Sequence, residues 1–249
     1  MLFRSLGPGC GLNGMDWGPD GRLYGPRWFT GEVVSFDVDA GDMRVEAQGF
    51  ATPAAVKFNS EGVLHVLDAG KGEVVRVVDG QNEVAVELEP GLDNFVFDDN
   101  DTIYFTSFID GYVNKVEQDG SITSFLPGGM SHPAGVVVMG DTVIVADVHS
   151  IRAFDANSGA SKYVQRNVLG ASEIGGAFNI SQDGNNLILT SWFDNDMRVW
   201  DPVNQKKLAH YTDMKGPVSA VRYGKGIAVT EHFAGRVAVY SNEGVEGRS

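Results

Sequence analysis

The sequence contains little sulfur and little positive charge. Among its 249 residues Cys10 is the only cysteine, so no internal disulfide can form and the redox compartment stays open. Lysine and arginine together number 19 against 33 acidic residues, which gives a formal net charge of −14 at pH 7. Nucleic acids and anionic membranes attract basic residues and repel an acidic surface, so the composition argues against both as partners.

Long apolar runs are absent as well. No stretch approaches the ~18 apolar residues of a membrane span, and residues 1–10 hold no run long enough for a signal peptide. We therefore expect a cytoplasmic protein. The sequence also lacks a Gly-x-Ser-x-Gly nucleophile elbow, a cysteine pair for zinc and a Gly-x-x-x-x-Gly-Lys-Ser/Thr phosphate loop, which sets those three chemistries aside.

What the sequence does contain is a repeat. A short apolar strand, an Asp/Asn/Gly turn and a second apolar strand recur six times, with steps of 41, 39, 41, 42 and 43 residues between equivalent positions. A period of about 40 to 50 residues with several strands per repeat is typical of a β-propeller. The last apolar residues before the six turns are Trp17, Phe58, Phe97, Val138, Ile180 and Tyr223.

Each repeat predicts a four-stranded blade. The turns are rich in Asp, Asn and Gly, which tolerate the positive φ of tight hairpins. The second strands are brief apolar runs rich in branched and aromatic residues, whereas third strands such as residues 31–36 alternate and fourth strands such as residues 43–46 are more polar. The last repeat has no clear fourth strand, and residues 1–6 could supply it. We predict one all-β domain over residues 1–249, a six-bladed propeller closed by the N-terminal strand; the alternative is a β-sandwich with accidental periodicity.

Two stretches carry a resemblance to a known family. They are Gly14-Met-Asp-Trp-Gly-Pro-Asp-Gly-Arg-Leu-Tyr24 with residues 31–37, and Asp93-Asn-Phe-Val-Phe-Asp98 with Ile103-Tyr-Phe-Thr106. They resemble the first and third blades of the six-bladed calcium-dependent lactonases, the family of gluconolactonase and regucalcin (senescence marker protein), and the resemblance covers the whole chain. The repeat pattern is shared with NHL-type propellers and with the virginiamycin B lyase group.

The resemblance implies one divalent cation, Ca²⁺ above all, at the mouth of the central channel. Asn13 falls on the first-blade ligand and Asp93 on the third-blade ligand, and both keep a side-chain oxygen. Ala134 and Gly176 fall on the fourth- and fifth-blade ligands and cannot bind a metal through their side chains. The metal set implied is therefore Asn13 and Asp93, with Glu173 as a neighbouring carboxylate.

Propeller geometry by itself predicts a site at one end of the channel. Loops that enter the inner strands and loops that leave the second strands meet there, and aromatic residues recur just past the second strands. A mouth with aromatic walls and a few polar groups suits a small molecule; blade-to-blade packing is the alternative for the aromatics, and an inter-blade ion pair for Arg27. The predicted substrate-binding residues are Arg27, Trp28, Phe108, Trp192 and Phe193.

Proton-transfer groups are expected at the same end. Histidine acts as a general base near neutral pH or as a metal ligand, and Glu231 beside His232 places a carboxylate next to an imidazole at a strand end. The alternative is that each histidine only bonds a neighbouring loop. Asp68 and Asp147, which end second strands, are expected to accept backbone N–H groups. The predicted catalytic residues are Asp93, His132, His149, Glu231 and His232.

Three functions remain open from the sequence. The first is a gluconolactonase-like hydrolase that acts on a small lactone or ester at a cation. The second is a metal-independent lyase, hydrolase or isomerase that uses the histidines and Glu231. The third is an NHL-type propeller that binds a partner without chemistry, since a fold alone assigns no function. The sequence does not decide the oligomeric state.

Overall fold

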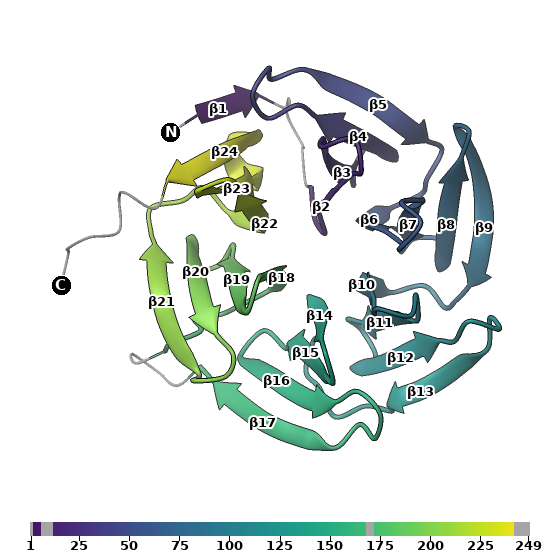
Figure 1. Ribbon diagram of the computed structural model, residues 1–249, viewed down its shortest axis with the longest axis vertical. Coiled ribbons are helices and arrows are strands. Elements are labelled where there is room, and N and C mark those ends of the chain that lie inside the picture. The colour runs from purple at the N-terminus through teal and green to yellow at the C-terminus, as the bar shows by residue number, and fades with distance from the viewer. Residues whose placement is uncertain (1, 6–11, 168–171, 242–249) are drawn as a thin grey trace.

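The computed structural model describes residues 2–5, 12–167 and 172–241. Six four-stranded antiparallel sheets stand around a central axis like the blades of a propeller (Figure 1). The predicted all-β, six-bladed architecture is thus confirmed. The described residues include no helix with the length and apolar character needed to cross a membrane.

Each blade runs from an inner strand at the axis to an outer strand at the rim of the ring (Figure 1). Blade 1 holds β2 Asp16–Trp17, β3 Leu23–Arg27, β4 Glu32–Phe36 and β5 Met43–Gln48; blade 2 holds β6 Pro53–Phe58, β7 Leu64–Asp68, β8 Glu73–Val78 and β9 Gln81–Glu87. Blade 3 holds β10 Leu92–Phe97, β11 Ile103–Ser107, β12 Tyr112–Val116 and β13 Ile122–Leu126; blade 4 holds β14 Val136–Met139, β15 Thr142–Ala146, β16 Ser150–Asp155 and β17 Ser161–Arg166.

Blades 5 and 6 complete the ring. Blade 5 holds β18 Asn179–Asp183, β19 Asn186–Ser191, β20 Asp196–Asp201 and β21 Lys206–Tyr211. Blade 6 holds β22 Pro217–Tyr223, β23 Gly226–Glu231 and β24 Arg236–Ser241, with the short 3-10 turn η1 His232–Ala234 between the last two. Strand β1, Leu2–Ser5, pairs antiparallel with β24 as the outer strand of blade 6, so the predicted closure by the N-terminal strand is confirmed.

Removing residues 2–5 is expected to lower the melting temperature by about 5 °C or more, since 1 kcal/mol corresponds to roughly 2–4 °C in a chain of this size. The deletion takes away the β1–β24 pairing, which runs from Leu2 opposite Val239 to Ser5 opposite Arg236, and leaves the edge of β24 open. Differential scanning calorimetry measures the shift. An unchanged melting curve would show that the closure adds nothing to stability.

The hydrophobic core lies between neighbouring blades. Every residue of the second strands β7, β11 and β23 is buried, because these strands have a blade on each side. The outer strand β9 is mostly exposed, which matches its polar sequence. One cluster joins blades 2 and 3 through Leu67, Phe95 and Phe105. Removing apolar side chains of this kind from water supplies most of the favourable free energy of folding.

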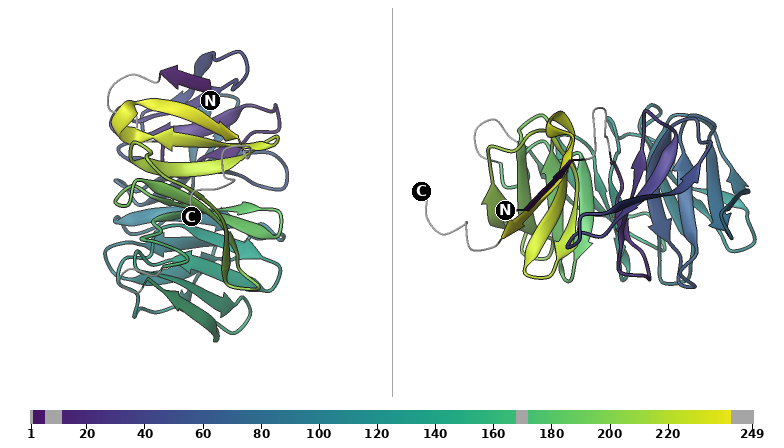
Figure 2. Two further views of the ribbon diagram at one scale, coloured as in Figure 1. Left: turned by 90° about the vertical axis from the view of Figure 1, so that its left-hand side faces the viewer. Right: turned by 90° about the horizontal axis from the view of Figure 1, so that it is seen from above.

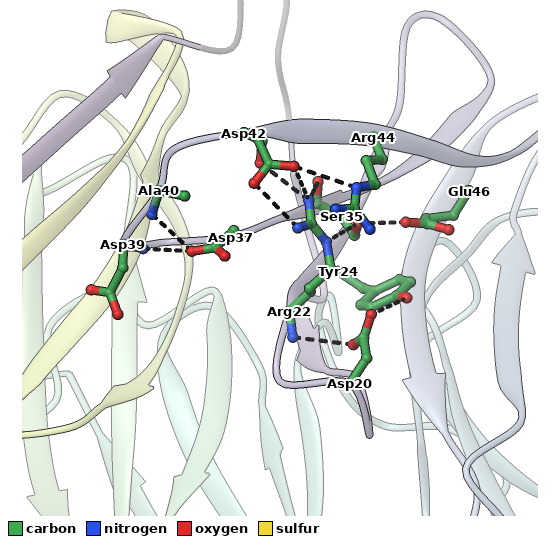
Figure 3. A network of polar contacts seen from close by, with 10 residues as sticks. All are labelled: Asp20, Arg22, Tyr24, Ser35, Asp37, Asp39, Ala40, Asp42, Arg44 and Glu46. Atoms are coloured by element: carbon green, nitrogen blue, oxygen red, sulfur yellow. Dashed lines mark hydrogen bonds and ion pairs between the residues drawn. The ribbon is translucent and has the colours of Figure 1, made fainter.

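Blade 1 also holds a polar network (Figure 3). Arg22 is 7% exposed, and its Nε donates to Ser35 Oγ at 2.7 Å. The same guanidinium lies 3.2 Å from Asp42 and holds the pKa of that carboxyl below its usual range. Ser35 Oγ in turn donates to Glu46 at 2.5 Å. The network joins β4 and β5 to the turn before β3, at the end of the blade away from the site described below.

A glycine closes the turn after the second strand in several blades. Gly31 and Gly111 have φ values of +67° and +71°, and a Cβ there would lie 2.3 and 2.4 Å from the carbonyl oxygens of Phe50 and Met130. The carbonyl of each glycine accepts an N–H bond from the same neighbouring loop. Only glycine combines this left-handed backbone with such a close approach. These contacts fix the turns that build the site. Viewed from the side, the ring carries turns on both of its faces (Figure 2).

Candidate ligand pocket at the channel mouth

The turn after the second strand supplies three equivalent positions in every blade. The first position ends the strand or directly follows it, and it is polar or charged in each blade: Arg27, Asp68, Ser107, Asp147, Ser191 and Glu231. The second position is Trp28, Ala69, Phe108, Val148, Trp192 and His232. The third, at the tip of the turn, is Phe29, Gly70, Ile109, His149, Phe193 and Phe233. The three positions have separate tasks.

Second-position residues form the wall of a cavity of about 450 Å³ at the channel mouth; five of the six line it, all except Val148. Residues that precede or begin inner strands, among them Leu92 and Pro217, also line it. Most of the lining is apolar or glycine. Apart from the tryptophan N–H groups, the polar side chains that line the cavity are Asn13, Thr52, Asp93 and His232. A few polar groups in an apolar concavity are typical of a small-molecule site.

The wall is a continuous series of aromatic contacts. Ring centroids are 5.6 Å apart between Phe108 and Phe178, and 5.5 Å between Phe178 and Trp192. The series continues from Trp192 to His232 at 6.5 Å and from His232 to Phe29 at 6.1 Å. It thus passes from blade 3 through blades 5 and 6 to blade 1. These separations are typical of interacting rings, so the side chains hold each other in place.

The predicted substrate-binding residues divide into two groups. Trp28, Phe108 and Trp192 line the cavity. Phe193 is 64% exposed and lies at the tip beside Trp192. Arg27 is not among the cavity-lining residues: its guanidinium pairs with Glu32 at 2.9 Å on the neighbouring strand of the same blade. The ion pair that was the alternative for Arg27 therefore forms, but within blade 1 and not between blades.

Asp93 is the one carboxylate among the cavity-lining residues. A bulge in β10 between Leu92 and Phe95 turns Asp93 to the cavity while Asn94 is buried beside it. The low-polarity surroundings raise the pKa of Asp93 to about 7, against the opposing effect of a hydrogen bond from Asn13. At neutral pH this carboxyl can therefore both accept and release a proton.

Buried amides orient Asn13. Asn179 Nδ2 donates to Asn13 Oδ1 at 2.7 Å, and Asn94 Nδ2 approaches Asn179 Oδ1 at 3.5 Å. These residues come from blades 1, 5 and 3, and each is less than 9% exposed. Because its oxygen faces Asn179, the Asn13 amide presents its N–H side to Asp93. We call Asn13, Asn94 and Asn179 the amide triad.

Three histidines were predicted at this end of the channel, and one of them lines the cavity. His232 does so, in contact with the rings of Phe29, Trp192 and Phe233. His132 is exposed, and its ring centroid lies 4.8 Å from that of Phe108. His149 is an exposed tip residue. The structure therefore brings Asp93 and His232 to one cavity, with His132 and His149 outside its lining.

Several first-position carboxylates anchor the entering loops. Asp68 accepts the N–H groups of Ala51 and Thr52 at 2.8 and 2.9 Å. Asp147 accepts that of His132 at 2.8 Å. These are the backbone bonds expected from the sequence for Asp68 and Asp147.

Glu231 has the same arrangement in blade 6. It is fully buried and accepts the N–H of Lys215 at 2.9 Å. It also accepts the Tyr240 hydroxyl at 2.9 Å and pairs with Arg236 at 2.5 Å. Glu231, predicted as catalytic, is not among the cavity-lining residues.

The predicted ligands Asn13, Asp93 and Glu173 do not form a calcium site in this structure. Glu173 accepts the backbone N–H of Lys207 on the outer strand β21 at 2.8 Å and does not line the cavity with Asn13 and Asp93. The oxygen of Asn13 is bonded to Asn179. Calcium takes about 6–8 oxygens, whereas this cavity offers one carboxylate among aromatic rings. Within the described part of the chain no three His, Cys, Asp or Glu side chains gather as a metal set.

No protein-family model matches the sequence, and no curated protein matches it. Solved structures do resemble the fold. A gluconolactonase from Xanthomonas campestris is 15% identical, with a TM-score of 0.75 over 96% of this chain and 89% of that one. The calcium-binding protein regucalcin from Agrobacterium tumefaciens is 17% identical, with a TM-score of 0.73 over 92% and 85%. A streptogramin B lyase is 16% identical, with a TM-score of 0.73 over 97% and 84%.

The likeness establishes the fold. Gluconolactonase and regucalcin, which the sequence motifs resemble, are among the proteins with this architecture. At these identities the likeness carries no activity or ligand from those proteins to this chain. The cavity itself shows two residues that the motifs did not indicate, Phe178 in the wall and Asn179 beneath it.

Proposed function

We propose that the protein is an enzyme that hydrolyses a small, mainly apolar lactone or ester, with Asp93 as the proton-transfer group and without a metal ion. One observation carries the proposal: a carboxyl with a pKa of about 7 lines an aromatic cavity whose other polar groups are few. A charged or sugar-like substrate would lose its hydration in such a cavity without gaining matching partners. An uncharged acyl compound would not.

The chain's own groups provide the steps of hydrolysis. Ionised Asp93 accepts a proton from a water molecule, and the water oxygen attacks the carbonyl carbon of the substrate. The Asn13 amide holds the Asp93 carboxyl in place through its hydrogen bond. When the tetrahedral intermediate collapses, the proton held by Asp93 passes to the departing alkoxide. The carboxyl thereby returns to its starting state.

The indole N–H of Trp192 is a buried donor without a partner among the described residues. The side chain lines the cavity. Buried donors without a partner are rare in folded proteins because each carries the cost of its lost hydration. The N–H is covered by protein in this ring orientation, so a substrate oxygen reaches it only if the indole turns toward the cavity.

A lyase or isomerase is the second candidate, and His232 favours it. This histidine lies on the same cavity wall and could remove a proton from a carbon atom of the substrate. The proteins of similar fold include one named a streptogramin B lyase and one named a gluconolactonase, so this architecture occurs in proteins named for either reaction. Replacing His232 with phenylalanine keeps the wall packed. The hydrolase proposal expects H232F to retain at least about a tenth of the activity, and the lyase proposal expects none.

The experiment measures turnover of aliphatic lactones, 4-nitrophenyl esters and sugar lactones, each in EDTA and in 1 mM calcium chloride. We expect aliphatic substrates to be hydrolysed faster than sugar lactones, with less than a twofold difference between the two buffers. His149→Ala, which changes an exposed residue outside the cavity lining, should behave as wild type. Turnover that disappears in EDTA and returns with calcium would overturn the metal-free mechanism. Binding without turnover, seen as quenching of tryptophan fluorescence, would favour a binding propeller instead.

A further inference from the structure

Four turns carry a large apolar side chain at the tip. Phe29, Ile109, Phe193 and Phe233 occupy the third position in blades 1, 3, 5 and 6 and are 69, 74, 64 and 66% exposed. Because the four turns are equivalent, their tips lie at the same end of the propeller as the cavity mouth. We call these four residues the apolar rim. Exposed apolar groups gathered at one place mark a binding surface more often than chance exposure does.

The apolar rim is continuous with the cavity wall. Phe29 and Ile109 line the cavity themselves. The ring of Phe193 lies 5.3 Å from that of Trp192, and the ring of Phe233 lies 5.5 Å from that of His232. Each rim residue therefore either lines the cavity or touches a residue that does. One apolar surface extends from beside Asp93 to the outside of the protein.

This continuity favours the substrate itself as the occupant of the apolar rim. A molecule confined to about 450 Å³ would contact Phe29 and Ile109 but leave Phe193 and Phe233 in water. Exposed Asp110 and Asp194 directly follow two of the tips, and the chain carries a net charge of −14, which opposes an anionic lipid surface. A substrate anchored in the cavity needs no such charge match.

We propose that the substrate is an amphiphile: an ester or lactone whose carbonyl end enters the cavity and whose long hydrocarbon part lies on the apolar rim. The proposal rests on the proposed function and adds the substrate class. Each methylene that leaves water on the rim should improve binding by up to about fourfold, the equilibrium factor for complete burial of a CH₂ group. Partial burial gives less, so we expect about twofold per methylene.

The test compares 4-nitrophenyl butyrate, octanoate and dodecanoate, all below their micelle-forming concentrations. In the wild type kcat/KM should rise at least about 30-fold from butyrate to dodecanoate. The double variant Phe193→Ser, Phe233→Ser changes the two rim residues that do not line the cavity. It should lose at least about tenfold on dodecanoate and stay within about twofold on butyrate. Val203→Ser removes an apolar side chain that is 81% exposed in the β20–β21 turn, at the other end of blade 5, and should change neither substrate.

Binding of decan-1-ol and butan-1-ol, followed by tryptophan fluorescence, tests the apolar rim independently of turnover. Decan-1-ol should bind at least about tenfold more tightly, and the double variant should lose this preference. If butyrate is hydrolysed but neither chain length nor the rim variant changes the rate, the proposal of an amphiphilic substrate is wrong and the proposal of a hydrolase stands. If no ester is hydrolysed but the alcohol preference depends on the rim, the hydrolase is wrong and the amphiphile stands. A chain-length effect that appears only with phosphatidylcholine vesicles would replace the substrate with a bilayer as the occupant.

Discussion

Asp93→Asn is expected to lower turnover of the best ester substrate by about 10³-fold. Asparagine has nearly the same shape and can still bond Asn13, but its amide cannot accept a proton from water. General acid–base catalysis of this kind is worth typically 10²–10⁴-fold. In the wild type, kcat/KM should rise with pH through about 7 as Asp93 ionises. A variant that keeps more than a tenth of the wild-type rate would remove Asp93 from the mechanism.

The same variant should be more stable than the wild type above neutral pH. An aspartate in an unfolded chain has a pKa of about 3.9, whereas the folded protein raises the pKa of Asp93 to about 7. Between these values the folded state holds a proton that the unfolded state has lost, so this residue's contribution to stability declines as pH rises from about 4 to 7. Asparagine does not ionise, so the residue at position 93 in the variant adds no pH dependence to the stability. The variant's melting temperature should exceed that of the wild type above pH 7, and the gap should close toward pH 4.

Thermal melts from pH 4 to pH 8 measure this difference. Asp99→Asn is the matched control, since it makes the same substitution at an exposed position. The control and the wild type should melt in parallel across the range. A parallel course for Asp93→Asn as well would mean that the cavity does not disfavour the charged carboxylate, and the acid–base role would lose its physical basis.

Glu231→Ala should lower the free energy of unfolding by about 2–4 kcal/mol, because it removes the buried acceptor of three hydrogen bonds, each worth about 1 kcal/mol or more. At roughly 2–4 °C per kcal/mol, the melting temperature should fall by about 10 °C. The carboxylate is fully buried and holds together a loop N–H, the Tyr240 hydroxyl and Arg236. Urea titration measures the free-energy change.

Glutamine at the same position separates a structural role from a catalytic one. Glu231→Gln keeps the shape but not the charge that faces Arg236, so it should also destabilise while the folded fraction keeps its activity within a few-fold. Loss of turnover at an unchanged melting temperature would instead make Glu231 catalytic. Glu32→Gln is the comparison, because its pair with Arg27 is partly exposed and such pairs contribute about 0–1 kcal/mol.

The sequence predicts the fold well because propeller signals are local. The turn residues and the strands beside them lie within about ten positions of each other, and their recurrence fixes the number of blades. The same reasoning places Trp28, Phe108 and Trp192 at the channel mouth, where the structure has them. Phe29 and Ile109 could have been found in the same way, since each directly follows one of the predicted wall residues.

The amide triad was beyond such reasoning. Asn13 and Asn179 are 166 positions apart, and no repeat indicates that their side chains meet. Glu231 and His232 show a different limit. Neighbouring residues at a strand end face different sides, so one enters the blade and the other the cavity. Glu231 and His232 are neighbours in the sequence, but the strand directs their side chains to different places, so they do not act as a pair in the cavity.

The amide triad joins blades 1, 3 and 5, which do not touch one another along the ring. These side-chain hydrogen bonds cross the central axis, so blades 1, 3 and 5 cannot move apart without breaking them. Because Asn13 belongs to the amide triad, its position beside Asp93 depends on blades 3 and 5 as well as on its own blade 1.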